Sequence, residues 1–226
     1  MAARGSSPFS CNWLVLRLAR QYLEGALTTY ARGRLLDIGC GEQPYAPAQT
    51  ATSQVTGLEY DRQRYAQTPP HIWGSALALP FAQASFDTVF SAQVLEHVPE
   101  PGRLIAEAGR ILKPGGHLIL SAPHIWGLHE EPHDYFRFTS YGLIHLSGQA
   151  GLECVRVQAM AGYWVTAGAR FCYYLARFER AGLGLLIRPL YALVQLTALG
   201  LDRLHRIESD TWNWLLVARK PPVPAP

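Results

Sequence analysis

Short apolar segments alternate with a helical segment in the first half of the chain, and this alternation limits the possible folds more than any other feature. Strands that are apolar along their whole length and alternate with helices form parallel sheets with helices on both faces. We therefore expect an α/β fold built on a doubly wound, mostly parallel sheet. The predicted strands cover residues 34–38, 54–59, 86–91 and 117–122, and the predicted helix covers 103–113.

The second half of the chain is organised differently. A polar and aromatic loop, 124–139, precedes a predicted helix over 140–150, which has Thr139 or Ser140 as its N-cap. Strands are predicted over 154–158 and 211–218. The expected organisation is a single domain, 1–226, with an N-terminal docking helix (10–31), a sheet core (34–160 and 210–220), an apolar helical insertion (162–209) and a frayed, proline-rich tail (221–226).

Composition excludes several classes of protein. Hydrophobic residues make up 49% of the chain and charged residues only 16%, which excludes a disordered chain. The net charge of +3 is too small to indicate a nucleic-acid binder. The four cysteines lie far apart without a C-x-x-C pair, so neither a zinc site nor a disulfide framework is expected. Residues 1–9 lack the apolar run of a signal peptide, and the expected compartment is the cytoplasm.

A glycine turn, residues 39–41, ends the first predicted strand, and an acid, Glu59, follows about 20 residues later, as in a dinucleotide site. Pro44 stands where that pattern has its third glycine, and Asp37 and Glu42 place two carboxylates where phosphates would lie. Because like charges repel, a nucleoside ligand with positive charge fits better than a pyrophosphate. S-adenosylmethionine has this character, whereas an NAD-dependent reductase becomes an unfavourable alternative.

Further segments in the same part of the chain carry a resemblance to a known family. Leu35–Gly41 and Gly57–Glu59 resemble the first two motifs of class I S-adenosylmethionine-dependent methyltransferases. Later segments are similar to the small-molecule, methyltransferase type 11-like branch, and the match runs from about residue 34 to residue 123. These segments are Leu79-Pro80-Phe81 with Ser85-Phe86-Asp87, Val94-Leu95-Glu96-His97-Val98, and Leu112-Lys113-Pro114-Gly115-Gly116.

The resemblance implies a Rossmann-like sheet of seven strands, with the insertion 162–209 between the last two. It implies that Glu59 holds the ribose hydroxyls of S-adenosylmethionine and that Asp37 lies near the cationic methionine part. Ser75 stands where the family usually has an acid, so its contact with adenine is expected to be weaker. The expected cofactor-binding residues are Asp37, Gly39, Cys40, Gly41, Glu59, Tyr60, Ser75, Ala76, Leu77, Gln93 and His97.

Candidate catalytic residues cluster in the loop after the strand 117–122, at the sheet edge where ligands bind in such folds. We expect His129 or His133 to be a general base that Asp134 orients. A metal site is the weaker variant, because Pro132 opposes a helix that would bring the two imidazoles onto one face, and no metal is expected. A loop packed by its own polar groups is the structural alternative.

The same loop carries candidate substrate contacts, namely His124, Tyr135 and Arg137. Tyr135 and Arg137 are suited to a polar or anionic acceptor. They are equally suited to pairing with Glu130 and Glu131 in the loop itself.

The insertion concentrates the apolar residues of the chain. Residues 181–201 have the length of a membrane span but carry Arg188 and Pro189 near the middle, and the chain must then return to the sheet. A transmembrane helix is therefore not expected. The open alternatives are packing on the domain, a roof over an apolar acceptor, a homodimer interface, and peripheral contact with acidic lipid headgroups at the inner membrane face. The arginines suited to such contact are Arg170, Arg177, Arg180, Arg188, Arg203 and Arg206.

Together these features predict an S-adenosylmethionine-dependent methyltransferase that acts on a small-molecule or lipid- or sugar-linked acceptor, with oxygen as the favoured acceptor atom. A scaffold protein that binds the cofactor without catalysis is the alternative from another class. No nucleic-acid partner is expected.

Overall fold

The computed structural model of the chain describes residues 7–45, 48, 51–65, 67 and 69–222. The last four residues of the predicted tail, 223–226, lie outside this set. The chain divides into two compact units, which are treated separately below. The described parts of Met1–Tyr22, His124–Gly127 and Ala159–Asn213 form the first unit, and those of Leu23–Pro123, Leu128–Gln158 and Trp214–Pro226 form the second.

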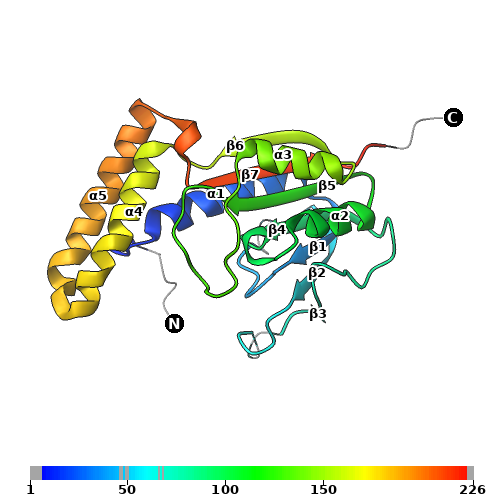
Figure 1. The fold of residues 1–226 in the computed structure, drawn as a ribbon, viewed down its shortest axis with the longest axis horizontal. Coiled ribbons are helices and arrows are strands. Elements are labelled where there is room, and N and C mark those ends of the chain that lie inside the picture. Colours follow the sequence, from blue (N-terminus) through cyan, green and yellow to red (C-terminus); the bar gives the residue numbers. More distant parts are fainter. Residues whose placement is uncertain (1–6, 46–47, 49–50, 66, 68, 223–226) are drawn as a thin grey trace. The chain divides into compact units, whose positions relative to one another are not determined.

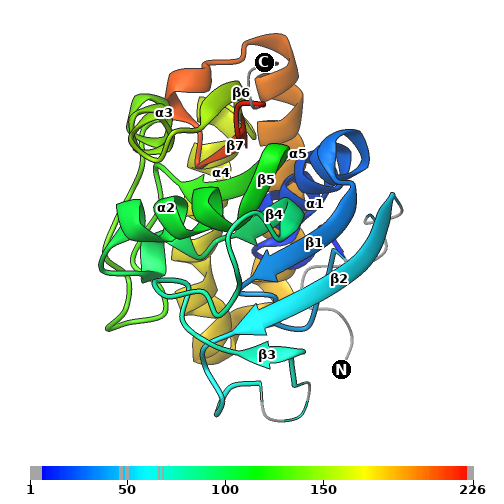
Figure 2. The same ribbon diagram turned by 90° about the vertical axis from the view of Figure 1, so that its right-hand side faces the viewer.

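A seven-stranded sheet with the strand order β3-β2-β1-β4-β5-β7-β6 forms the centre of the fold (Figures 1 and 2). The pairs β1–β2, β1–β4, β2–β3 and β4–β5 are parallel, which confirms the predicted mostly parallel sheet. The strands are β1 (Gly33–Ile38), β2 (Thr52–Glu59), β3 (Ile72–Trp73), β4 (Phe86–Ala92), β5 (Leu112–Pro123), β6 (Glu153–Ala159) and β7 (Asn213–Arg219).

β7 runs against the direction of its neighbour β5. Near the start of β5, the Gly115 N–H donates to the Lys220 carbonyl just after β7 (2.8 Å). After the end of β5, the His124 N–H donates to the Trp212 carbonyl just before β7 (2.9 Å). The insertion therefore connects β6 to the antiparallel strand of the sheet.

The helices have almost the bounds that the periodicity predicts. α1 covers Trp13–Tyr30, α2 covers Pro101–Ile111, and α3 covers Ser140–Gln149. The Thr139 hydroxyl accepts from the Gly142 N–H (3.0 Å), which confirms the predicted N-cap. One boundary differs, because α2 ends at Ile111 and β5 begins at once with Leu112. A register shift before Thr88 lets Leu112 pair with Phe86, so Leu112 and Lys113, predicted as the end of the helix, belong to the strand.

Both faces of β5 are buried, as the doubly wound arrangement requires. Leu118, Leu120 and Ala122 point to one face and belong to an apolar cluster with residues of α2 and α3. His117 points to the other face, where its ring lies 5.6 Å from that of Tyr30 in α1. Because side chains alternate along a strand, a strand with helices on both sides is apolar throughout.

The insertion forms a helical hairpin in the first unit. α4 (Tyr163–Phe178) and α5 (Gly184–Leu204) lie side by side and are joined by a short π-helical segment, Glu179–Leu183 (Figure 1). A Cβ at Gly168 would lie 2.7 Å from the Ala198 Cβ, so the glycine lets the two helices approach closely. Cys172, Leu175 and Tyr191 form the buried contact between them.

Gln195 of α5 joins the insertion to the N-terminal segment. Its side chain is completely buried. The amide nitrogen donates to the carbonyls of Pro8 (3.0 Å), Ser10 (2.9 Å) and Tyr191 (3.2 Å), and the amide oxygen accepts from the Leu14 N–H (2.9 Å). The Leu14 N–H lies in the first turn of α1, where helical N–H groups lack partners within the helix. One side chain therefore fixes the start of α1 against α5.

We expect Gln195→Leu to lower the free energy of unfolding by about 2–4 kcal/mol, because it leaves a buried N–H and carbonyl groups without partners. Urea denaturation followed by circular dichroism measures the change. Thr197→Ala, on the exposed face of the same helix, is the matched control and is expected to shift the free energy by less than about 0.5 kcal/mol. Equal effects of the two substitutions would contradict this role of Gln195.

Candidate active site

The predicted glycine turn directly follows β1 in the second unit. Gly39 and Gly41 have φ angles of 70° and 49°, in the left-handed region that favours glycine. A Cβ at Gly39 would also collide with the side chain of Val94. The N–H groups of Gly39 and Cys40 both donate to the Leu58 carbonyl at the end of β2 (2.9 and 3.2 Å). These two hydrogen bonds therefore fix the turn at the carboxyl edge of the sheet.

Asp37 and Glu59 lie buried at this edge. Burial, and secondarily the charge of Glu59, raise the pKa of Asp37 to about 8. The Glu59 carboxylate accepts from the N–H groups of Gly41 (3.1 Å) and Tyr60 (2.8 Å), so backbone donors fix its position. Burial likewise raises the pKa of the Cys40 thiol to about 12, so that this thiol stays uncharged. A ligand at this edge therefore meets carboxyl groups and the uncharged thiol of Cys40.

A pocket of about 420 Å³ opens beside the glycine turn. Four predicted cofactor residues line it: Asp37, Gly39, Cys40 and Gly41. Arg64, Tyr65 and Tyr45 line it as well and were not predicted, because they lie in irregular segments without a periodic or motif signal. The full lining is Asp37, Gly39, Cys40, Gly41, Glu42, Pro44, Tyr45, Arg64, Tyr65, Phe90 and Ala92.

The remaining predicted cofactor residues lie on the same sheet edge but outside this lining. Tyr60 follows Glu59 and is 76% exposed. The Ser75 hydroxyl accepts from the Leu77 N–H (3.2 Å) in the turn after β3, which also contains Ala76. Their contacts with a cofactor stay predictions, as do those of Glu59. The same holds for Gln93, whose amide donates to the Ser121 hydroxyl (3.0 Å), and for His97.

The pocket fits a nucleoside ligand that carries positive charge. Gly39 and Gly41 contribute backbone without side chains to the lining, and the carboxyl residues Asp37 and Glu42 line the same space. The Arg64 guanidinium, the cation of the lining, is already paired with the Glu130 carboxylate (2.7 Å). The donor set thus suits a sulfonium and an ammonium group rather than a pyrophosphate.

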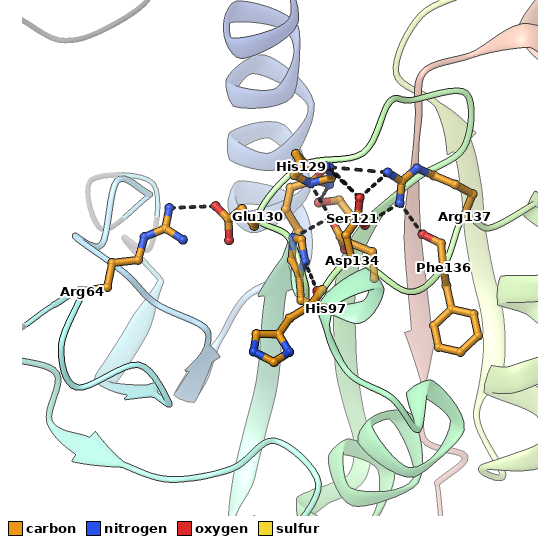
Figure 3. Close-up of polar contacts among 11 residues, drawn as sticks. Arg64, His97, Ser121, His129, Glu130, Asp134, Phe136 and Arg137 are labelled. Carbon is orange, nitrogen blue, oxygen red and sulfur yellow. Dashed lines mark hydrogen bonds and ion pairs between the residues drawn. The ribbon is translucent and has the colours of Figure 1, made fainter.

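The predicted catalytic loop contains a closely bonded group of polar side chains (Figure 3). Arg137 donates to both carboxylate oxygens of Asp134 at 2.7 Å. This hydrogen bond lowers the pKa of Asp134 to about 2. The same carboxylate accepts from the His129 N–H (2.9 Å) and lies 3.3 Å from the His129 Nδ1. Asp134 therefore orients His129, one of the two expected bases.

The other predicted contacts of this loop are arranged differently. Nδ1 of His133 contacts the Tyr135 hydroxyl (3.0 Å), so His133 does not share Asp134 with His129. Arg137 pairs with Asp134 rather than with Glu130 or the neighbouring Glu131, and its guanidinium is engaged by the loop itself. His124 belongs to the first unit, whereas the rest of the loop group belongs to the second.

Glu96, which the sequence did not single out, lies at the centre of this region. It is completely buried in the short 3-10 helix Leu95–His97 that follows β4. Among the described residues, neither of its carboxyl oxygens has a hydrogen-bond partner. Burial raises the pKa of Glu96 to about 8. Nε2 of His97 and Nε2 of His129 lie 3.8 and 3.9 Å from its Oε1. An acid next to a histidine, with apolar residues on both sides in the stretch 94–98, was the available signal.

The fold and the site together define a class of protein. A doubly wound sheet with β7 antiparallel carries a glycine turn after β1 and an acid at the end of β2, beside a pocket of acidic character. Next to it, a loop with imidazoles and carboxyl groups lies at the same edge. This arrangement is that of a group-transfer enzyme with a cationic nucleoside cofactor.

Comparisons with known proteins agree with this class. A family model described as "Methyltransferase domain" matches residues 36–120. The 27-O-demethylrifamycin SV methyltransferase of Amycolatopsis mediterranei is 32% identical over 181 residues, which are 66% of each chain. The biotin biosynthesis bifunctional protein BioHC of Cellvibrio japonicus is 38% identical over 99 residues, or 40% of this chain and 20% of that protein. The chain thus spans at most about two thirds of the length of these curated relatives.

Solved structures share the fold over most of the chain. An S-adenosylmethionine-dependent methyltransferase from Mesorhizobium loti has a TM-score of 0.58 at 19% identity and covers 89% of this chain and 97% of its own. The [4+2]-cyclase SpnF has a TM-score of 0.58 at 21% identity and covers 90% of this chain and 80% of its own. The chain belongs to the class I S-adenosylmethionine-dependent methyltransferases, and S-adenosylmethionine is its cofactor.

We expect the affinity for S-adenosylmethionine to depend on the ionisation of Asp37. Its carboxyl group is neutral below its pKa of about 8 and must lose a proton to pair with the cationic cofactor. Affinity should therefore rise by up to about tenfold per pH unit between pH 5.5 and 7, where the cofactor's own ammonium stays protonated. Calorimetry in buffers of different ionisation enthalpy measures the proton released.

Asp37→Asn is expected to bind the cofactor more weakly and to remove this proton release. Glu42→Gln, at an exposed position of the same pocket, is the matched control and should keep it. A wild-type affinity that does not change with pH, or a proton release that survives in Asp37→Asn, would contradict the role of Asp37.

Proposed function

We propose that this chain transfers a methyl group from S-adenosylmethionine to a hydroxyl oxygen of a small-molecule or lipid- or sugar-linked acceptor. The observation that carries the proposal is the position of Glu96, His97 and His129 in one cluster at the same sheet edge as the cofactor pocket. A neutral hydroxyl must lose its proton during methyl transfer, whereas an amine is already nucleophilic. Imidazole and carboxyl groups at the acceptor side favour oxygen.

The chain connects the cofactor pocket to this cluster in two ways. Ala92 lines the pocket at the end of β4, and Glu96 and His97 follow it a few residues later. Arg64 also lines the pocket, and its ion pair reaches Glu130 in the loop that carries His129 (Figure 3). An acceptor held by the cluster would therefore lie near the ligand of the pocket.

Each side chain of the proposed acceptor site has a definable task. Asp134, held by Arg137, fixes the ring of His129. The His133 carbonyl accepts from the His97 Nδ1 (2.7 Å) and fixes the ring of His97. Both Nε2 atoms are thus directed to the space beside Glu96, where the acceptor hydroxyl would be oriented. When bound, S-adenosylmethionine supplies the methyl group and the leaving group.

The name of one relative supports oxygen as the acceptor atom. The 27-O-demethylrifamycin SV methyltransferase, which is 32% identical, acts on a demethylated oxygen by its name.

The test is methyl transfer from labelled S-adenosylmethionine to a panel of alcohols, phenols, amines and thiols that includes 27-O-demethylrifamycin SV. We expect labelled methyl ethers, and we expect His129→Gln to lower kcat/KM by about 10²-fold or more while cofactor affinity changes less than about twofold. His145→Gln, on the exposed side of α3, is the matched control. Methylation of nitrogen or sulfur alone would contradict the proposal. Cofactor binding without any transfer would favour a scaffold role.

A further inference from the structure

We infer that Glu96, His97 and His129 form a binding site for one divalent transition-metal ion. One oxygen of Glu96 and one nitrogen of each histidine lie within 4.8 Å of one another. Two imidazoles and one carboxylate are a frequent ligand set for Zn²⁺ and Fe²⁺, and they leave coordination positions open for oxygen ligands. The inference rests on the proposed function and specifies how the cluster would hold the acceptor's oxygen.

The distances favour a shared ion over direct hydrogen bonds. Oε1 of Glu96 lies 3.8 Å from Nε2 of His97 and 3.9 Å from Nε2 of His129, too far for hydrogen bonds. Atoms bound to one tetrahedral Zn²⁺ at about 2.1 Å lie about 3.4 Å apart. The three groups, which lie within 4.8 Å of one another, are therefore close to the spacing that one shared ion requires.

The unpartnered carboxyl group of Glu96 is the second, independent observation. Both of its oxygens are buried without a hydrogen-bond partner among the described residues. Such a group costs free energy, and in native structures it commonly indicates an ion or water that belongs there. A cation between the two imidazoles would remove this cost.

The contacts that orient the two imidazole rings suit metal binding. The His97 Nδ1 contacts the His133 carbonyl (2.7 Å), and because a carbonyl only accepts, Nδ1 carries the proton and Nε2 offers a lone pair. The His129 Nδ1 lies 3.3 Å from the Asp134 carboxylate and 3.5 Å from an Arg137 nitrogen. The Arg137 nitrogen can only donate, so these two contacts orient the ring of His129 without fixing the position of its proton. Histidine ligands of metals are typically oriented by such carbonyl and carboxylate partners.

A bound ion would give the acceptor site its selectivity for oxygen. Its open positions would take water or the acceptor's hydroxyl, and its charge would favour the ionised form of that hydroxyl, with the proton passing to water. Acceptors with two neighbouring oxygens would bind best, because they can occupy two open positions.

The test is Zn²⁺ titration of the chelator-treated full chain by calorimetry, together with the absorption spectrum of the Co²⁺ form. We expect one ion per chain and a Co²⁺ spectrum of low-symmetry nitrogen and oxygen coordination. Glu96→Gln, which keeps the shape of the side chain, should weaken binding by at least 100-fold. Asp134→Asn, which acts through His129, should weaken it by about 10–100-fold. His133→Gln is the control, because its ring contacts Tyr135 instead.

Two outcomes would overturn the metal site. One is that protein which still binds S-adenosylmethionine does not bind Zn²⁺ stoichiometrically. This outcome would leave the proposed function intact. The other is binding that Glu96→Gln does not weaken. Absence of S-adenosylmethionine binding would instead count against the proposed function, since calorimetry measures the two ligands separately.

A second, independent observation concerns the surface of the α4–α5 hairpin in the first unit. Leu185 and Leu186 of α5 are 90% and 71% exposed, and Leu183 and Phe178 beside them are also exposed. We name these four residues the hairpin tip. Ala181–Leu204 is long and apolar enough to cross a membrane by length and composition. Only 22% of an apolar 18-residue stretch within it is buried. It thus differs from the core helix of a soluble protein.

We propose that the hairpin tip inserts into the surface of an anionic membrane on its cytoplasmic side. Residues 163–201 contain four arginines and one acid, Glu179. Glu179 is already bonded to Arg188 (2.9 Å) and to the Tyr191 hydroxyl (2.9 Å). Exposed Arg177 flanks the tip, where a cation can meet acidic headgroups while leucines enter the acyl boundary. Buried Gln195 and Tyr191 keep α5 packed on protein, which favours insertion over a span.

Co-sedimentation with vesicles of phosphatidylcholine alone, or mixed with phosphatidylglycerol, tests this surface. We expect binding to the anionic vesicles that weakens with salt and falls at least tenfold in Leu185→Ser/Leu186→Ser. Leu204→Ser, 85% exposed at the other end of α5, is the matched control. The proposal is overturned if the anionic vesicles bind neither the wild-type protein nor the Leu185→Ser/Leu186→Ser variant, or if they bind these two proteins equally. A dimer in analytical ultracentrifugation that the double substitution dissociates, without vesicle binding, would assign the tip to a second copy.

Discussion

Asp37 and Glu96 are two of the acids buried at the carboxyl edge of the sheet, and the ligands of the site depend on the free energy that this burial costs. Asp37 lies one residue before the end of β1 and Glu96 follows β4, so neighbouring parallel strands bring both acids to the same edge. Burial raises the pKa of each to about 8. An isolated buried charge is unfavourable, so each acid gains a stable charged form only when a cation arrives. The edge is therefore selective for positively charged ligands.

Asp134 shows the opposite behaviour a short distance along the chain. Arg137 holds its carboxylate in a two-bonded pair, and its pKa falls to about 2. His129 therefore lies between a permanent anion at Nδ1 and a neutral buried acid near Nε2. Enzyme sites commonly hold two acids in environments that give the two groups different pKa values. Here these environments place the two nitrogens of His129 beside acids of opposite ionisation.

The parts of this molecule that follow periodicity or a close backbone approach were predictable from the sequence. The strands, the glycine turn and Asp37 belong to this group, because each has a local physical requirement. Glu96 was not predictable in this way, since its role depends on burial among residues far along the chain. Arg64 lies in an irregular segment that carries no pattern. For Arg137 the sequence offered several nearby acids, and the spacing of three residues within the folded loop selects Asp134.

The two ends of the insertion meet. The Met160 N–H donates to the Asn213 carbonyl (3.1 Å), and the Ala161 N–H lies 3.3 Å from the Thr211 hydroxyl. A segment that leaves and re-enters at adjacent positions can be lengthened or replaced without altering the register of the strands, because closure entropy grows only slowly with length. Related chains could thus inherit one chemical centre and exchange the helical hairpin as a module. The diversity of acceptors in such a lineage would then evolve at this junction.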